Sequence, residues 1–194
     1  MDANIKELAN TMWTLVDSIG NVMGHEDFSR AARMEVAQYL MYLSASDGEI
    51  KWSESIVISE ILGFSLSPSQ INDFIREKDI YSVSFESTIP AVFKTVVDIE
   101  NKLYAMGHLN AARTSAAEGI VLLYKCVGDE LLKSDGIVDD TEKNNFVIFI
   151  RMLENYLDAN LYRRASGVKT NFNKESGSAS APMKSGVSAP QKKG

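Results

Sequence analysis

Two short acidic segments contain the residue types that hold divalent cations. Residues 47–54 read DGEIKWSE and residues 135–142 read DGIVDDTE, so both follow the pattern Asp-Gly-x-(Ile/Val)-x-x-(Ser/Thr)-Glu. The two copies lie 88 positions apart, and each stands between two apolar stretches of helical type. Carboxylate oxygens are the ligands that Ca2+ and Mg2+ prefer. The repeat therefore indicates either a cation site or a pair of structural turns.

Neither segment can complete a cation site alone. Gly48, Ile50 and Glu54 match positions 6, 8 and 12 of a calcium-binding EF-hand loop. Positions 1 and 3 fall on Leu43 and Ala45, which have no carboxylate, and the second segment lacks the same two ligands. A complete shell therefore needs both turns to converge. The ligands predicted for Ca2+ or Mg2+ are Asp47, Glu49, Glu54, Asp135, Asp139, Asp140 and Glu142.

The structural alternative explains the same residues through local backbone chemistry. Glycine after aspartate lets the chain reverse in a left-handed conformation, and the aspartate accepts hydrogen bonds from amides of the turn. Glu142 lies three residues after Asp139, as in a capping box at a helix start. Lys51 takes the equivalent position in the first copy, so capping explains Glu142 better than Glu54. Both interpretations stay open.

Signatures of catalysis are absent from the sequence. No serine, threonine or cysteine stands in a recognisable nucleophile motif, and no phosphate-binding or dinucleotide-binding glycine pattern occurs. Only two histidines are present, too few for a zinc motif. We therefore expect no enzyme. His25 and His108 each follow Met-Gly, which suggests a second trace of duplication, although their spacing of 83 requires an insertion.

Helical periodicity dominates the chain. An apolar stripe with spacings of three and four predicts a first helix that ends near Gly24, and such a face suits self-association through residues 1–24. The stripe consists of Ile5, Leu8, Met12, Leu15, Ile19 and Val22. Trp13 beside it is expected in the core, whereas Trp52 lies in a polar turn and is expected to be partly exposed, where it could anchor a partner.

Six further helices are predicted from apolar periodicity and from start and stop signals. Ser67, Pro68 and Gln70 form a capping box, and Gly63 is typical of a helix end. Residues 78–89 lack a partner strand and are expected to form a loop. The predicted spans are 27–44, 53–62, 68–77, 90–106, 110–132 and 141–162. The expected fold is all-α, a single bundle of about seven helices with internal pseudo-duplication.

Charge divides the chain in two. Residues 163–194 contain seven Lys or Arg and one Glu, whereas the preceding residues contain 13 Lys or Arg and 25 Asp or Glu. We expect residues 1–164 to form one domain, with 1–24 as an amphipathic helix and 25–164 as the core, and 165–194 to be a disordered, basic, low-complexity tail. The acidic body argues against nucleic acid as a partner. Cys126 allows no disulfide within the chain, and no leader or membrane-spanning stretch is apparent, so a cytoplasmic location is expected.

The turn motifs resemble those of the tellurite-resistance TerB-like family. The resemblance rests on residues 46–50 with Glu54, on the helix end at 62–63, on the helix started by Ser67, and on residues 134–142 with the helix through 152–153. It covers about residues 25–160. This chain differs from the family pattern in Ser46 before the first aspartate, in the added N-terminal helix and in the basic tail.

The resemblance implies an all-helical fold with internal pseudo-symmetry and a role in tellurite resistance, other stress responses or phage resistance. It also implies divalent-metal binding by acidic residues that fall here on Asp47, Glu54, Asp135 and Glu142, and a place as an adaptor near membrane complexes. We therefore expect a non-enzymatic interaction module of a bacterial stress-response or defence system that binds a protein partner and is regulated by a cation. The alternative is a metal-ion or oxyanion resistance protein whose metal site is its function.

Overall fold

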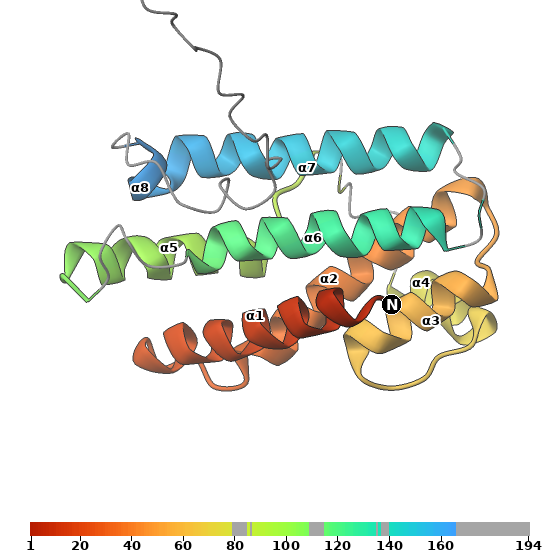
Figure 1. Cartoon of the computed structure of the whole chain (residues 1–194), viewed down its shortest axis with the longest axis horizontal. Coiled ribbons are helices and arrows are strands. Elements are labelled where there is room, and N and C mark those ends of the chain that lie inside the picture. Colours follow the sequence, from red (N-terminus) through yellow and green to blue (C-terminus); the bar gives the residue numbers. More distant parts are fainter. Residues whose placement is uncertain (79–84, 86, 109–114, 135, 137–139, 166–194) are drawn as a thin grey trace, which may run out of the picture.

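The computed structural model describes residues 1–78, 85, 87–108, 115–134, 136 and 140–165. All regular elements in this part of the chain are helices, as expected (Figure 1). The elements are α1 (Ala3–Val22), α2 (Phe28–Ser44), η1 (Ala45–Asp47), α3 (Trp52–Leu62), α4 (Pro68–Lys78), α5 (Ala91–Ala105), α6 (Ala116–Lys133), α7 (Asp140–Asn160) and α8 (Tyr162–Ala165). Of the tail predicted over residues 165–194, only Ala165 is among the described residues.

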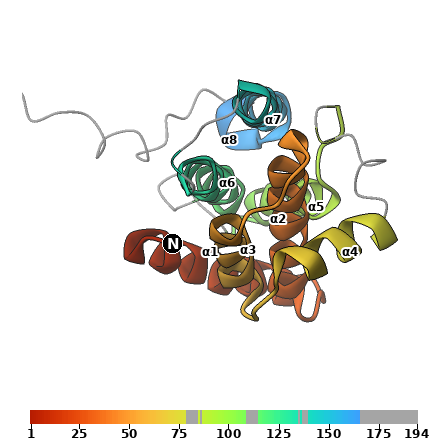
Figure 2. The same ribbon diagram turned by 90° about the vertical axis from the view of Figure 1, so that its right-hand side faces the viewer.

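The helices form three layers. Helices α7 and α8 lie on one side, α2, α5 and α6 lie in the middle, and α1, α3 and α4 lie on the other side (Figures 1 and 2). Helix α2 packs against α1, α3, α5, α6 and α7, so it is the centre of the bundle. None of the described helices is long and apolar enough to cross a membrane.

Local signals fix several helix ends as predicted. The backbone N–H of Ser67 donates to Oε1 of Gln70 at 2.9 Å, and the N–H of Gln70 donates to Oγ of Ser67 at 3.3 Å. This reciprocal pair is the expected capping box at the start of α4. Gly63 has a φ of 82° at the end of α3, a left-handed conformation that favours glycine.

The internal duplication appears in how the helices pair. Helix α1 packs on α2 as α5 packs on α6, and α2 packs on α3 as α6 packs on α7. Across the two halves, the α1–α6 contact corresponds to the α5–α2 contact, and the α3–α6 contact corresponds to the α7–α2 contact. Helices α1 to α3 therefore match helices α5 to α7, while α4 and α8 have no equivalents among the described elements.

The same comparison explains the spacing of the two Met-Gly-His segments. Gly24 and Gly107 follow α1 and α5 with φ values of 78° and 74°, so they end equivalent helices. Residues 23–27 connect α1 to α2, whereas the longer segment 106–115 connects α5 to α6. The second connection is five residues longer, which accounts for a spacing of 83 at the histidines and 88 at the turns.

The apolar face of α1 belongs to the core. Met12, Trp13 and Val16 are at most 3% exposed, and α1 packs against α2, α5 and α6. Trp13 is buried as expected, whereas Val22 at the end of the predicted stripe is 62% exposed. The face expected to support self-association through residues 1–24 is therefore occupied within the chain.

Helix α6 begins later than the predicted residue 110. Ser115 is its N-cap, because the hydroxyl accepts from the N–H of Glu118 at 3.1 Å and donates to Oε2 of Glu100 at 2.9 Å. The N–H of Ala117 also donates to Glu100, at 3.0 Å. A buried carboxylate on α5 thus fixes the start of α6, and residues 109–114 lie outside the described residues.

Candidate functional site

The first acidic turn has the conformation that its sequence predicts. Gly48 has a φ of 90°, and its N–H donates to the carbonyl of Ala45 at 3.1 Å. Ile50 is buried in the core. Asp47 ends η1, and its side chain lies outside the described residues, while Glu49 is exposed to solvent.

Glu54 has a structural role that the sequence did not predict. Its side chain is 3% exposed, and Oε2 accepts a hydrogen bond from the backbone N–H of Lys51 at 2.7 Å. This bond satisfies an amide at the start of α3, which has no partner inside the helix. Capping therefore explains Glu54 as well, even though lysine occupies the N-cap position of α3.

The second turn repeats this arrangement where it is described. Gly136 has a φ of 78°, and its N–H donates to the carbonyl of Lys133 at 3.2 Å. Asp140 is exposed at the first position of α7, and Glu142 is 5% exposed at the third position, as Glu54 is in α3. Asp135 and Asp139 lie outside the described residues.

The two turns lie at the same end of the bundle. Figure 1 shows α2 leading into the first turn and α6 leading into the second at the right-hand end of the molecule. Element η1 contacts α7, and α3 contacts α6, so the helices that adjoin the two turns meet at this end of the bundle.

The side chains that the structure describes do not complete a cation site. Within the described residues, no three His, Cys, Asp or Glu side chains are grouped to hold a metal ion. Of the predicted ligands, Glu49, Glu54, Asp140 and Glu142 are described, and both glutamates at helix starts are buried. The side chains of Asp47, Asp135 and Asp139 are not among the described ones, so the shared site stays a prediction.

Two further carboxylates act at helix starts and were missed by the sequence analysis. Glu35 on α2 accepts from the N–H groups of Val92 and Phe93 at 2.8 and 3.1 Å, and burial raises its pKa to about 7. Glu100 holds the start of α6 as described above. No local sequence signal identifies either contact, because Glu35 is 57 residues from Val92.

The outer face of α3 bears the main exposed apolar cluster next to the turns. Trp52, Ile56 and Phe64 are 68%, 54% and 55% exposed, and they line a groove of about 440 Å³ together with Ser55, Ser59, Glu60, Gly63, Ser65 and Leu66. Trp52, for which partial exposure was expected, is mostly exposed. Val57, Ile58 and Ile61 fill the inward face of α3, whereas Ile56 lies on its outward face. We call Trp52, Ile56 and Phe64 the α3 patch.

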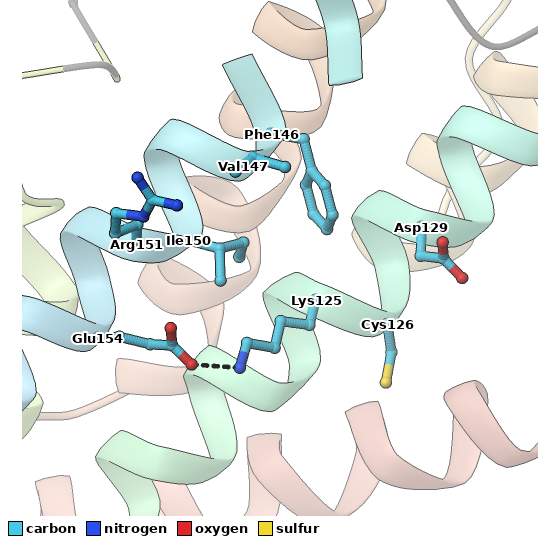
Figure 3. Close-up of a pocket in the computed structure, with 8 residues that line it drawn as sticks. All are labelled: Lys125, Cys126, Asp129, Phe146, Val147, Ile150, Arg151 and Glu154. Atoms are coloured by element: carbon cyan, nitrogen blue, oxygen red, sulfur yellow. Dashed lines mark hydrogen bonds and ion pairs between the residues drawn. The ribbon is translucent and has the colours of Figure 1, made fainter. Parts of the chain in front are cut away.

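A second groove, of about 530 Å³, lies between α6 and α7. Lys125 and Glu154 form an ion pair across it, and Phe146 reaches from α7 towards α6 (Figure 3). Cys126 lines the groove, but burial raises the pKa of its thiol, which disfavours the reactive thiolate. The Cys126 thiol is therefore not activated as a nucleophile in this groove.

The chain matches no protein-family model, no curated protein and no solved structure. The resemblance to the TerB-like family therefore depends on the turn motifs and their setting between helices.

Proposed function

We propose that this chain is a TerB-like, non-enzymatic interaction module and that it binds a protein partner on the α3 patch. The observation that carries the proposal is the exposure of Trp52, Ile56 and Phe64 beside one groove. Tryptophan and other large side chains that meet in a pocket provide most of the energy of typical protein interfaces. Scattered exposed apolar residues need no explanation, whereas a clustered set rimmed by polar groups indicates a binding surface.

The α3 patch is not needed for the core. The inward side of α3 already buries Val57, Ile58 and Ile61, so the outward side chains gain burial only on association. Complete burial of one large apolar side chain contributes about 1.5–3 kcal/mol. The patch can therefore supply binding energy without loss of folding stability.

The position of Trp52 links the patch to the first acidic turn. Trp52 is the first residue of α3, and the Glu54–Lys51 hydrogen bond fixes the backbone on which it stands. A cation bound at the paired turns would therefore affect the position of the Trp52 indole through the backbone at the start of α3. We extend the proposal to a bacterial stress-response or defence system near a membrane complex, on the strength of the family resemblance.

Site-specific crosslinking tests the proposal. A photoreactive benzoylphenylalanine at Phe64 keeps an aromatic group in the patch, and the same probe at Ile148 on the equivalent helix α7 provides the control. In cells, we expect one crosslinked protein with the probe at Phe64, none at Ile148, and loss of the product when Trp52→Ser is added. The captured protein should then bind the purified chain. Equal crosslinking at both positions, or no loss with Trp52→Ser, would contradict the proposal.

A second candidate function is cation-dependent stress resistance through the paired turns. The contacts of η1 with α7 and of α3 with α6 support it, because the helices that adjoin the two acidic segments meet. A bound ion stabilises the folded state by about 2.7 kcal/mol at a hundredfold excess over its dissociation constant. Calorimetry with millimolar Ca2+ or Mg2+ should show that gain in the wild type and not in Asp47→Asn/Asp135→Asn. An unchanged wild-type midpoint would exclude the site.

A further inference from the structure

The outer face of α3 has a graded row of side chains. Trp52, Ile56, Ser59 and Gly63 follow one another at spacings of four, three and four, which places them on one stripe of the helix. The first two are large and exposed, and the last two are small. Phe64 stands beside the small end. The groove therefore has small side chains on its floor between Ile56 and Phe64.

We propose that the α3 patch binds the α3 patch of a second copy of this chain, with the two helices antiparallel. A two-fold axis between positions 57 and 58 places Trp52 of one copy opposite Gly63 of the other, and Ile56 opposite Ser59. Large side chains then enter the open positions of the facing helix, as in knobs-into-holes packing. This inference rests on the proposed function and names the partner.

Charge complementarity supports the antiparallel direction. A side chain at Gly63 would have its Cβ 4.0 Å from Nη1 of Arg33, so a cation lies at the small end of the row. The first acidic turn, with exposed Glu49, lies at the Trp52 end. Antiparallel pairing brings the acidic turn of each copy towards Arg33 of the other, whereas parallel pairing places like charges together. The arrangement is isologous, so it closes at two copies.

The size of the contact predicts a reversible dimer. The interface between two short helices buries less surface than a standard interface, which buries about 1,200–2,000 Å². The acidic body adds repulsion at low salt. We therefore expect the dimer to form with rising concentration.

Light scattering and sedimentation of the full chain test the inference over about 5–500 µM, a range that brackets micromolar affinity. The mass should rise from 21.4 kDa towards twice that value. Ile56→Arg and Trp52→Ser should each weaken association by at least about a hundredfold, because each change occurs twice in the dimer. Ile148→Arg on α7, a matched change at an exposed isoleucine, should leave it unaltered.

A charge exchange tests the direction of the helices. Glu49→Lys and Arg33→Glu should each weaken self-association by about tenfold, since two-fold symmetry places each repulsive pair in the dimer twice. An equimolar mixture of these two variants should associate as strongly as the wild type, because both pairs are then attractive. Arg33 lies 5.2 Å from the Trp13 ring, so thermal melting must first show that Arg33→Glu is folded. If it is not, Glu49→Lys alone tests the direction of the helices, and Ile56→Arg against Ile148→Arg tests self-association through the α3 patch.

The outcomes separate this inference from the proposed function. A wild-type mass that stays at 21.4 kDa throughout, or a dimer that Ile56→Arg does not weaken, would overturn the inference. If the chain is monomeric while the probe at Phe64 captures a different protein, the proposed function stands and the second copy is excluded. If the chain is monomeric and the probe captures nothing, both fail.

Discussion

The carboxylate of Glu35, in the middle of α2, accepts the backbone N–H of Val92 in the first turn of α5 at 2.8 Å. Phe93 donates a second N–H to the same carboxylate at 3.1 Å. The central helix thereby caps the helix that opens the second half of the chain. The rings of Tyr39 and Tyr124 lie 5.5 Å apart in the core, and burial together with the charge of Glu35 raises the pKa of Tyr124.

Glu35 makes stability depend on pH. Burial, opposed by the backbone hydrogen bonds, raises its pKa from 4.5 to about 7. The folded state therefore binds more protons than the unfolded state between these values, and stability falls as pH rises through that window. The loss is roughly 3 kcal/mol by pH 8 at about 1.36 kcal/mol per unit. Urea unfolding from pH 4 to 8 should show this slope in the wild type but not in Glu35→Gln, and parallel profiles would contradict it.

Substitutions at Glu54 distinguish a cap from a metal ligand. Glu54→Ala leaves the N–H of Lys51 without its acceptor and should cost about 1–2 kcal/mol of unfolding free energy. Glu54→Gln keeps an acceptor oxygen and should cost less than half of that. Both differences should be the same with and without Ca2+ in denaturant titrations. A loss that appears only when Ca2+ is present would instead assign Glu54 to the cation site.

Gly128 marks a close approach of α6 and α7. A Cβ there would lie 2.4 Å from Cε2 of Phe146, a rigid ring that cannot yield easily. Gly128→Ala should therefore cost about 1–3 kcal/mol from overpacking, against a gain of about 1 kcal/mol in helix propensity. Thermal unfolding measures the net effect. Combination with Phe146→Leu should recover stability, and simple additivity of the two changes would argue against the contact.

Deletion of residues 1–24 should unfold the chain. The deletion removes Met12, Trp13 and Val16 from the core, and loss of one such side chain alone typically costs about 2–5 kcal/mol. Circular dichroism and amide dispersion in NMR spectra should show a loss of cooperative structure. A folded, monomeric product would show that α1 is an accessory helix, as the sequence alone had suggested.

Helix ends that depend on neighbouring residues were predicted correctly from the sequence. Helix ends that depend on residues far along the chain were not. The α4 capping box involves only Ser67 and Gln70, and the glycine at the end of α3 acts on its own helix, so both were predicted correctly. The start of α6 depends on Glu100, which lies 15 residues before Ser115. Distant helices likewise decide which side of α3 is covered, so hydrophobicity alone does not place Ile56 on the outward face.

Helices of the first half pack on helices of the second half, and this affects how the chain folds during its synthesis on the ribosome. Met12 of α1 packs at Gly119 of α6, where a Cβ would lie 2.2 Å from its sulfur. This contact joins residues more than one hundred positions apart. Helix α1 packs on α2 as well as on α6, so the burial of its apolar face is complete only after α6 has emerged. Neither half closes a core of its own, so we expect folding to begin late in translation and to complete in one cooperative step.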